Sequence, residues 1–305
     1  MQPTLTYSQF RNDFVAPSKC LDLADYLTRA EQGVSLLQDE NNLRLAVHDL
    51  FDQLCSDHVI YAEIRLAPLL HTRKGLLPAE VVDIIDDAVD TCCTTTGIEA
   101  RVILCTLRHF TMDQSVDTVN LVKRFRGRRV AAFDIAGDEA GYPLDAHVPA
   151  FRYALASNIP CTAHAGEAKG AESVWETLHL LQPSRIGHGV RSVDDVPLIQ
   201  YLRQNRIHLE ICPTSNVQTD VVPSIAHHQI DRLFAAGVSV GINTDARCIS
   251  EVTLRDEYEL LHNTFGWNGE HFRQCNLNAI EAAFVPDNLK QKLTAQVLEG
   301  YDRGA

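Results

Sequence analysis

Four polar side chains that could take part in acid–base or metal chemistry stand near the ends of short apolar segments. His164 lies in IPCTAHAG, and Glu167 follows it three residues later. His188 lies in RIGHG, and Asp245 ends VSVGINTD. Imidazole nitrogen and carboxylate oxygen are the usual ligands of zinc, which activates water when one position stays open. If the fold brings these segment ends together, the pattern favours a zinc site with a catalytic water.

Each of these side chains also has a structural interpretation when it is taken alone. A histidine in an apolar segment is often a hydrogen-bonded core residue. Asp245 could cap the following helix, and Glu167 could hold a loop. Two imidazoles and two carboxylates recur at equivalent positions, however, and this recurrence favours the functional interpretation.

The apolar segments themselves predict the elements that carry these residues. Seven segments bounded by turn residues predict strands at 59–68, 100–107, 130–137, 159–166, 185–189, 208–215 and 238–245. The stretches between them repeat apolar residues at three- and four-residue spacing, which predicts helices. Alternating strands and helices indicate a parallel sheet covered by helices. In a closed parallel barrel the active site forms at the carboxyl ends of the strands, where the four polar residues are expected.

The domain organisation follows from this pattern. We expect helices and no strand over residues 1–58 and the seven strand–helix units over residues 59–245. Closing helices are expected over residues 246–305. We therefore expect a single domain over residues 1–305 with an α/β fold, a (β/α)8 TIM-type barrel whose first strand is missing.

Composition excludes several classes of protein. The apolar fraction of 45% and the charged fraction of 22% are those of a soluble globular protein. The sequence contains no run of about 18 apolar residues, the length that could span a membrane. Asp13, Asp22 and Asp25 do not fit a secretory signal, so we expect a cytoplasmic protein. The net charge of −13 argues against a nucleic-acid partner. Nine cysteines without a Cys-x-x-Cys pair favour neither disulfides nor a thiolate zinc site.

Six motifs together carry a family resemblance. YAEIR, DIAGDE, TAHAGE, RIGHG, LEICPTSN and INTD occur in this order, and the likeness extends over roughly residues 20–303. The sequence resembles the adenosine deaminase family, whose members are barrels of the metallo-dependent hydrolase kind. The resemblance implies an enzyme that converts adenosine or a related aminopurine, with water, to inosine and ammonia. A purine nucleoside would be its substrate.

The resemblance also implies a role for each candidate residue. His164 and Asp245 would bind one zinc ion per chain, and Asp245 would also handle the proton of the attacking water. His188 would orient the hydroxide, and Glu167 would donate a proton to a ring nitrogen of the purine. Gly137 would offer its backbone N–H to the base.

Further polar residues receive structural interpretations. Glu63 and Arg65 share one face of the first predicted strand, which favours an inward ion pair. Glu210 and Ser215 are expected to help fix His188 or Asp245. His228, in a predicted loop, is assigned no role.

Two positions depart from the family pattern. Family members carry a His-x-His pair on the first barrel strand, whereas none of the thirteen histidines here is two residues from another. We therefore expect that the segment bearing the first strand is missing, that two ligands hold zinc weakly, and that open barrel edges could associate with another copy. Ala246 stands where the family more often has a second aspartate that hydrogen-bonds the purine.

Two alternatives to a deaminase stay open at this point. One is a non-catalytic relative that retains the purine pocket and acts by binding. The other is a metal-free barrel enzyme with a Schiff-base lysine, which needs a desolvated lysine at a strand end. Lys169, just past TAHAGE, is the nearest candidate for such a lysine, and a loop position is its simpler interpretation.

Overall fold

A computed structural model describes residues 6–303 of the chain. The chain divides into two compact units, each built around its own parallel sheet. The first unit comprises Met1–Val15 and Leu27–Cys161, and the second comprises Ala16–Tyr26 and Thr162–Ala305. The single domain over residues 1–305 stays a prediction.

The first unit contains three strands in the order β1-β2-β3, all parallel. Its strands are β1 (Tyr61–Leu66), β2 (Glu99–Leu107) and β3 (Val130–Ala136). Its helices are α1 (Tyr7–Phe14), α2 (Leu23–Leu36, which begins in the second unit), α3 (Glu40–Ser56), α4 (Pro78–Thr96), α5 (Met112–Phe125) and α6 (Val148–Ala156), with short 3-10 turns η1 (Pro68–His71) and η2 (Asp145–His147). Among the described residues before β1 there are helices and no strand, as the sequence of residues 1–58 predicted.

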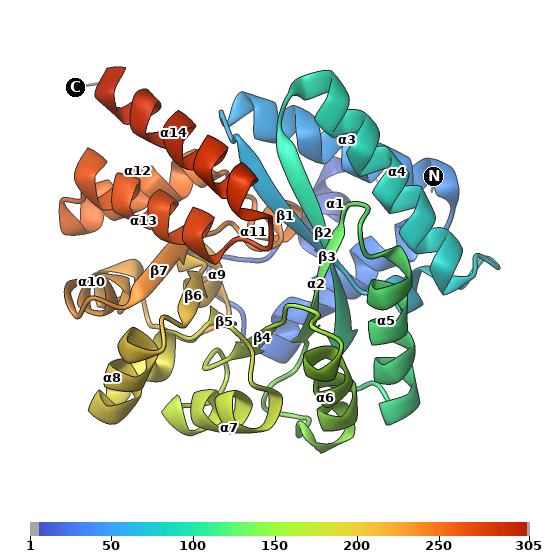
Figure 1. The fold of residues 1–305 in the computed structure, drawn as a ribbon, viewed down its shortest axis with the longest axis horizontal. Coiled ribbons are helices and arrows are strands. Elements are labelled where there is room, and N and C mark those ends of the chain that lie inside the picture. The colour runs from blue at the N-terminus through green and yellow to red at the C-terminus, as the bar shows by residue number, and fades with distance from the viewer. Residues whose placement is uncertain (1–5, 304–305) are drawn as a thin grey trace. The chain divides into compact units, whose positions relative to one another are not determined.

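Local signals explain where the helices of this unit begin and end. Helix α4 opens with Pro78 in its first turn and stops at Gly97, whose φ of +78° suits a residue without a Cβ. Helix α5 begins with a capping box between Thr111 and Gln114. Both helices pack on β2, whose residues 102–104 are completely buried (Figure 1). Burial on both faces is the reason that the middle of β2, residues 102–105, is an uninterrupted apolar run.

The second unit contains four parallel strands in the order β4-β5-β6-β7. These strands are β4 (Thr162–Ala165), β5 (Arg185–His188), β6 (His208–Ile211) and β7 (Ser239–Ile242). The helices are α7 (Ala171–Leu181), α8 (Val196–Gln204), α9 (Pro213–Gln218), α10 (Ile230–Ala235), α11 (Arg247–Ser250), α12 (Leu254–Phe265), α13 (Gly269–Ala282) and α14 (Asp287–Arg303), with 3-10 turns η3 (Val190–Asp194) and η4 (Ile225–His227). Figure 1 shows α13 against β7 and α14 against α13, as the predicted closing helices.

All seven predicted strands are present, but four of them, at 59–68, 159–166, 208–215 and 238–245, were each predicted four residues too long. The segment 208–215 is a strand only as far as Ile211, because Pro213 begins helix α9 at its first turn. The side chains of residues 213–216 therefore leave from a helix. Among residues 6–303, no helix has both the length and the apolar character that crossing a membrane requires.

Candidate active site and metal centre

The first two candidate residues leave the carboxyl end of β4 on either side of a sharp turn. His164 lies within the strand and is partly buried, and Glu167 follows the strand with 6% of its surface exposed. Gly166 between them has a φ of +68°, and a Cβ there would lie 2.7 Å from Val174 Cγ2. Glycine at this position therefore allows the chain to turn tightly against α7 and to hold Glu167 near the end of the strand.

The next candidate, His188, ends the neighbouring strand β5. It is 2% exposed and has a φ of +61°, which is rare for a residue with a side chain and is characteristic of functional sites. Its Nε2 lies 3.5 Å from Oε2 of Glu167, and its ring centroid lies 5.3 Å from that of His164. A Cβ on Gly187 would lie 3.0 Å from His164 Cγ, so this glycine leaves room for the His164 ring.

Asp245 follows strand β7 and is held by helix α9. It also has a positive φ, +55°, and its side chain is exposed. Ser215 Oγ donates a hydrogen bond of 2.9 Å to Oδ2 of Asp245. The expectation that Ser215 fixes Asp245 is thus confirmed.

Helix α9 is itself anchored by a buried carboxylate. Glu257 of α12 is completely buried, and its two carboxylate oxygens accept from the backbone N–H of Thr214 at 3.1 and 3.2 Å. Burial is the main reason that the pKa of Glu257 is raised from 4.5 to about 7; the Thr214 hydrogen bonds oppose this rise, and the charges of Asp256 and Asp245 add to it. The helix that orients Asp245 therefore rests on a group that changes charge near neutral pH.

A buried tyrosine, Tyr26, belongs to the same unit as Asp245. Tyr26 and Ser250 share a 2.9 Å hydrogen bond between their hydroxyl groups. Burial, followed by the charge of Asp245, raises the pKa of the Tyr26 phenol well above its ordinary value of 10.0. Tyr26 therefore stays neutral and can only donate or accept hydrogen bonds there. The sequence patterns did not predict that Tyr26 would be buried close to Asp245.

The structure brings together one set of potential metal ligands among residues 6–303. One ligand atom each from His188, Cys212 and Asp245 lies within 4.8 Å of the other two. Nitrogen, sulfur and oxygen donors of these types suit zinc and similar transition metals. The residues present therefore fit a metal ion. The composition argued against a thiolate ligand, yet Cys212 belongs to this set. His164, expected as a ligand, is not in this set.

The remaining candidates lie as follows. Gly137 belongs to the first unit, directly after β3, and has a φ of +101° that favours glycine. Glu210 of β6, expected beside His188 or Asp245, pairs with Arg185 at 2.7 Å and accepts from Thr162 Oγ1 at 3.1 Å. It thus ties β6 to β4 and β5.

The polar face of β1 makes two contacts in addition to the expected pairing of Glu63 with Arg65, which stays a prediction. Arg65 Nε lies 3.1 Å from Oδ2 of the buried Asp134 on β3. Glu63, the expected partner of Arg65, accepts a hydrogen bond from the Tyr61 hydroxyl at 2.6 Å. The sequence could not show the Arg65–Asp134 pair, because its members are far apart along the chain.

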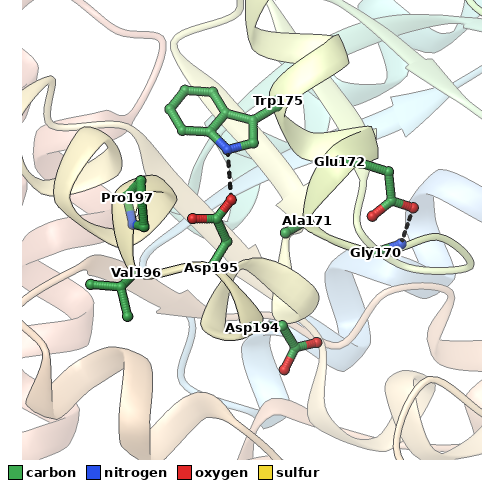
Figure 2. Close-up of a pocket in the computed structure, with 8 residues that line it drawn as sticks. All are labelled: Gly170, Ala171, Glu172, Trp175, Asp194, Asp195, Val196 and Pro197. Atoms are coloured by element: carbon green, nitrogen blue, oxygen red, sulfur yellow. Dashed lines mark hydrogen bonds between the residues drawn. The ribbon is translucent and has the colours of Figure 1, made fainter.

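A pocket of about 640 Å³ opens beside the first turns of α7 and α8 (Figure 2). Trp175 Nε1 donates to Oδ2 of Asp195 at 3.0 Å, and Glu172 accepts from the backbone N–H of Gly170 at 3.0 Å. Asp195 also caps α8. These carboxylates stabilise the starts of helices, and none of His164, Glu167, His188 and Asp245 lines the pocket. The candidate chemistry lies at the strand ends instead.

Solved structures share this fold over nearly the whole chain. Adenine deaminase from Arthrobacter aurescens superposes with a TM-score of 0.91 at 24% identity, covering 99% of this chain and 91% of that one. An amidohydrolase from Burkholderia ambifaria with bound Zn superposes with a TM-score of 0.89 at 24% identity, covering 98% and 83%. The fold is therefore the α/β barrel fold of the metal-dependent hydrolases, as the alternation of strands and helices predicted.

Sequence comparison identifies the family within this class. The adenosine deaminase family profile matches residues 2–300. An adenosine deaminase of Clostridium acetobutylicum is 34% identical over 284 residues, 93% of this chain and 85% of that protein. One from Mycobacterium ulcerans is 35% identical over 313 aligned positions, 97% of this chain and 86% of that protein. The chain belongs to the adenosine deaminase family, which is metal-dependent.

Proposed function

We propose that this chain hydrolyses the amino group of adenosine or a closely related aminopurine, with zinc as the metal. The observation that carries the proposal is the convergence of Glu167, His188 and Asp245 from the ends of β4, β5 and β7 in one parallel sheet. Relatives named as adenosine deaminases at 34% and 35% identity support the same reaction.

The proposed chemistry adds water to the ring carbon that bears the amino group. The C–N bond then breaks and ammonia leaves, so that adenosine and water give inosine and ammonia. Glu167 donates a proton to the neighbouring ring nitrogen, which makes the carbon more electrophilic. Its burial beside His188 suits this role, because the acid is screened from bulk water.

Asp245 and His188 handle the attacking water in this proposal. Asp245 takes up a proton from it, and the Ser215 hydrogen bond keeps the receiving carboxylate in position. His188 presents Nε2 toward Glu167 and orients the incoming oxygen. Zinc, when bound, supplies the Lewis-acid activation that makes water nucleophilic at neutral pH. His164 and Asp245 would hold the ion, and Cys212 offers a further donor close to Asp245.

The substrate is proposed to be the nucleoside. The structural neighbours at 22–24% identity include proteins named as an adenine deaminase, an N6-methyl-AMP deaminase and a complex with IMP, so the fold serves purines with and without ribose and phosphate. The sequence relatives at 34% and 35% identity are named for adenosine. The higher identity favours adenosine.

The test compares three substrates on one preparation of the chain with measured zinc content. Adenosine, adenine and AMP are incubated separately, and ammonia and the deaminated purine are quantified. We expect the zinc-loaded chain to deaminate adenosine. We also expect kcat/KM to be higher for adenosine than for adenine or AMP. A higher kcat/KM for adenine or AMP would overturn the choice of substrate. Absence of ammonia from all three, with one zinc bound per chain, would overturn the reaction itself.

A further inference from the structure

A chain of buried hydrogen bonds leads away from the candidate site behind His188. The backbone N–H of Ile230 donates to Nδ1 of His228 at 3.0 Å. His228 Nε2 lies 3.1 Å from Oδ1 of Asn216, and Asn216 Nδ2 lies 3.0 Å from Nδ1 of His188. His228, Asn216 and His188 are 3%, 0% and 2% exposed, so water does not compete for these contacts.

The direction of these hydrogen bonds is fixed at the backbone end. A backbone N–H can only donate, so Nδ1 of His228 must accept and carries no proton. Burial and, to a smaller extent, the nearby His188 together lower the pKa of His228 to about 3, so the ring is neutral at physiological pH. A neutral imidazole has one N–H group. The proton of His228 therefore lies on Nε2.

The amide of Asn216 fixes the direction of the next hydrogen bond in the same way. Because His228 Nε2 donates, the Asn216 atom facing it must be the carbonyl oxygen. The amide nitrogen then faces His188 and can only donate, so Nδ1 of His188 must accept. The proton of neutral His188 is left on Nε2, the atom 3.5 Å from Glu167 Oε2.

We infer that His228 and Asn216 act as positioning residues that hold His188 in its Nε2-protonated tautomer, with this N–H directed toward Glu167. His188 is then a hydrogen-bond donor to the groups in front of it and cannot take a proton from the attacking water at Nε2. In the proposed reaction the O–H bond of water breaks and its proton goes to the carboxylate of Asp245. This mechanistic meaning rests on the proposed function, whereas the tautomer itself does not.

The direct test measures the tautomer in the unaltered protein. Histidine is labelled with 15N, and long-range 1H–15N spectra separate protonated from unprotonated ring nitrogens. The resonances of His188 are identified by their loss in His188→Gln. We expect Nε2 of His188 to be protonated and Nδ1 to be unprotonated. A protonated Nδ1 would overturn the inference and would leave the deaminase proposal untouched, since substrate turnover is measured separately.

A variant reverses the relay with almost no change in shape. In Asn216→Asp the carboxylate still accepts from His228 Nε2, but it can only accept from His188 as well. Nδ1 of His188 should therefore gain a proton, and deamination should fall by about 10- to 100-fold, the usual effect of changing a partner that orients a residue of the site. Asn205→Asp, at an exposed position after α8, is the matched control and should keep both the spectrum and the rate. An unprotonated Nδ1 in folded Asn216→Asp would contradict the relay.

Discussion

Nε2 of His188 and Oε2 of Glu167 face each other at 3.5 Å across the ends of two neighbouring strands, both within a buried region. At this separation an imidazole and a carboxyl group can contact the same bound molecule. In the proposed reaction Glu167 would contact a purine nitrogen, and His188 would contact the attacking oxygen.

Glu167→Gln should remove the proposed proton donor and keep its shape. We expect turnover of adenosine to fall by roughly 100- to 10,000-fold, the range for a lost general acid, while zinc content stays unchanged. Steady-state kinetics and metal analysis on the same preparation check both expectations. Glu176→Gln, at an exposed position of α7, is the control and should keep the parent rate. A rate within threefold of the parent for Glu167→Gln would remove Glu167 from this role.

Gly187→Ala tests whether the position of the His164 ring matters for the metal. The added Cβ would meet His164 Cγ at 3.0 Å, which forces the ring to shift by a few tenths of an ångström. If His164 is a ligand, zinc affinity should weaken by about tenfold or more, equivalent to about 1.4 kcal/mol. Competition with a metal chelator measures this change. Gly33→Ala, where nothing lies within 4 Å of the new Cβ, should keep the parent affinity. Equal affinity in both variants would argue against His164 as a ligand.

Glu257 should make the stability of the chain depend on pH. Its pKa of about 7 in the folded protein lies above the ordinary value of 4.5, so the folded state binds this proton more tightly than the unfolded state. The contribution to stability is complete below the ordinary value and is lost as pH rises through about 7. The loss amounts to about 3 kcal/mol, since one pKa unit corresponds to about 1.36 kcal/mol.

Glu257→Gln removes the titration and keeps an oxygen that can accept from Thr214. Its unfolding free energy, measured by urea denaturation, should rise relative to the parent between about pH 5 and about pH 8. Glu259→Gln, on the exposed face of the same helix, should show no such trend. A constant difference between Glu257→Gln and the parent across this range would show that Glu257 does not titrate there.

Ala246→Asp tests recognition of the base. The resemblance assigns a purine hydrogen bond to an aspartate at this position, next to Asp245. Adding that carboxylate should raise kcat/KM for adenosine by about tenfold, the effect of about 1.4 kcal/mol. Zinc content should not change. A lower kcat/KM in a normally folded variant would mean that alanine suits the substrate of this chain better.

Sequence patterns predicted the strands well, for a physical reason. Parallel strands that are buried on both faces must be apolar throughout, and the turns that end them need residues such as Gly166 and Gly189, which have positive φ. A polar residue at such a strand end therefore stands out. This is why His188 and Asp245 could be selected as candidate site residues from the sequence alone.

The support behind the site could not be predicted in the same way. Cys212 reads as a core thiol until Pro213 is known to begin a helix that turns the chain there. His228 acts through a contact with Asn216, twelve residues away, and its loop has no periodic pattern. Glu257 reads as a surface residue of a helix, yet it is completely buried. Each of these roles depends on tertiary packing, which local spacing does not encode.

Asp245 is proposed to serve both the metal site and the deamination chemistry. The most direct measurement compares the parent chain with Asp245→Asn for zinc bound per chain and for inosine formed from adenosine. We predict zinc-dependent inosine formation by the parent, and loss of both bound zinc and inosine formation in Asp245→Asn. Equal inosine formation by the two proteins, or formation that persists in the parent after zinc is removed, would contradict the account.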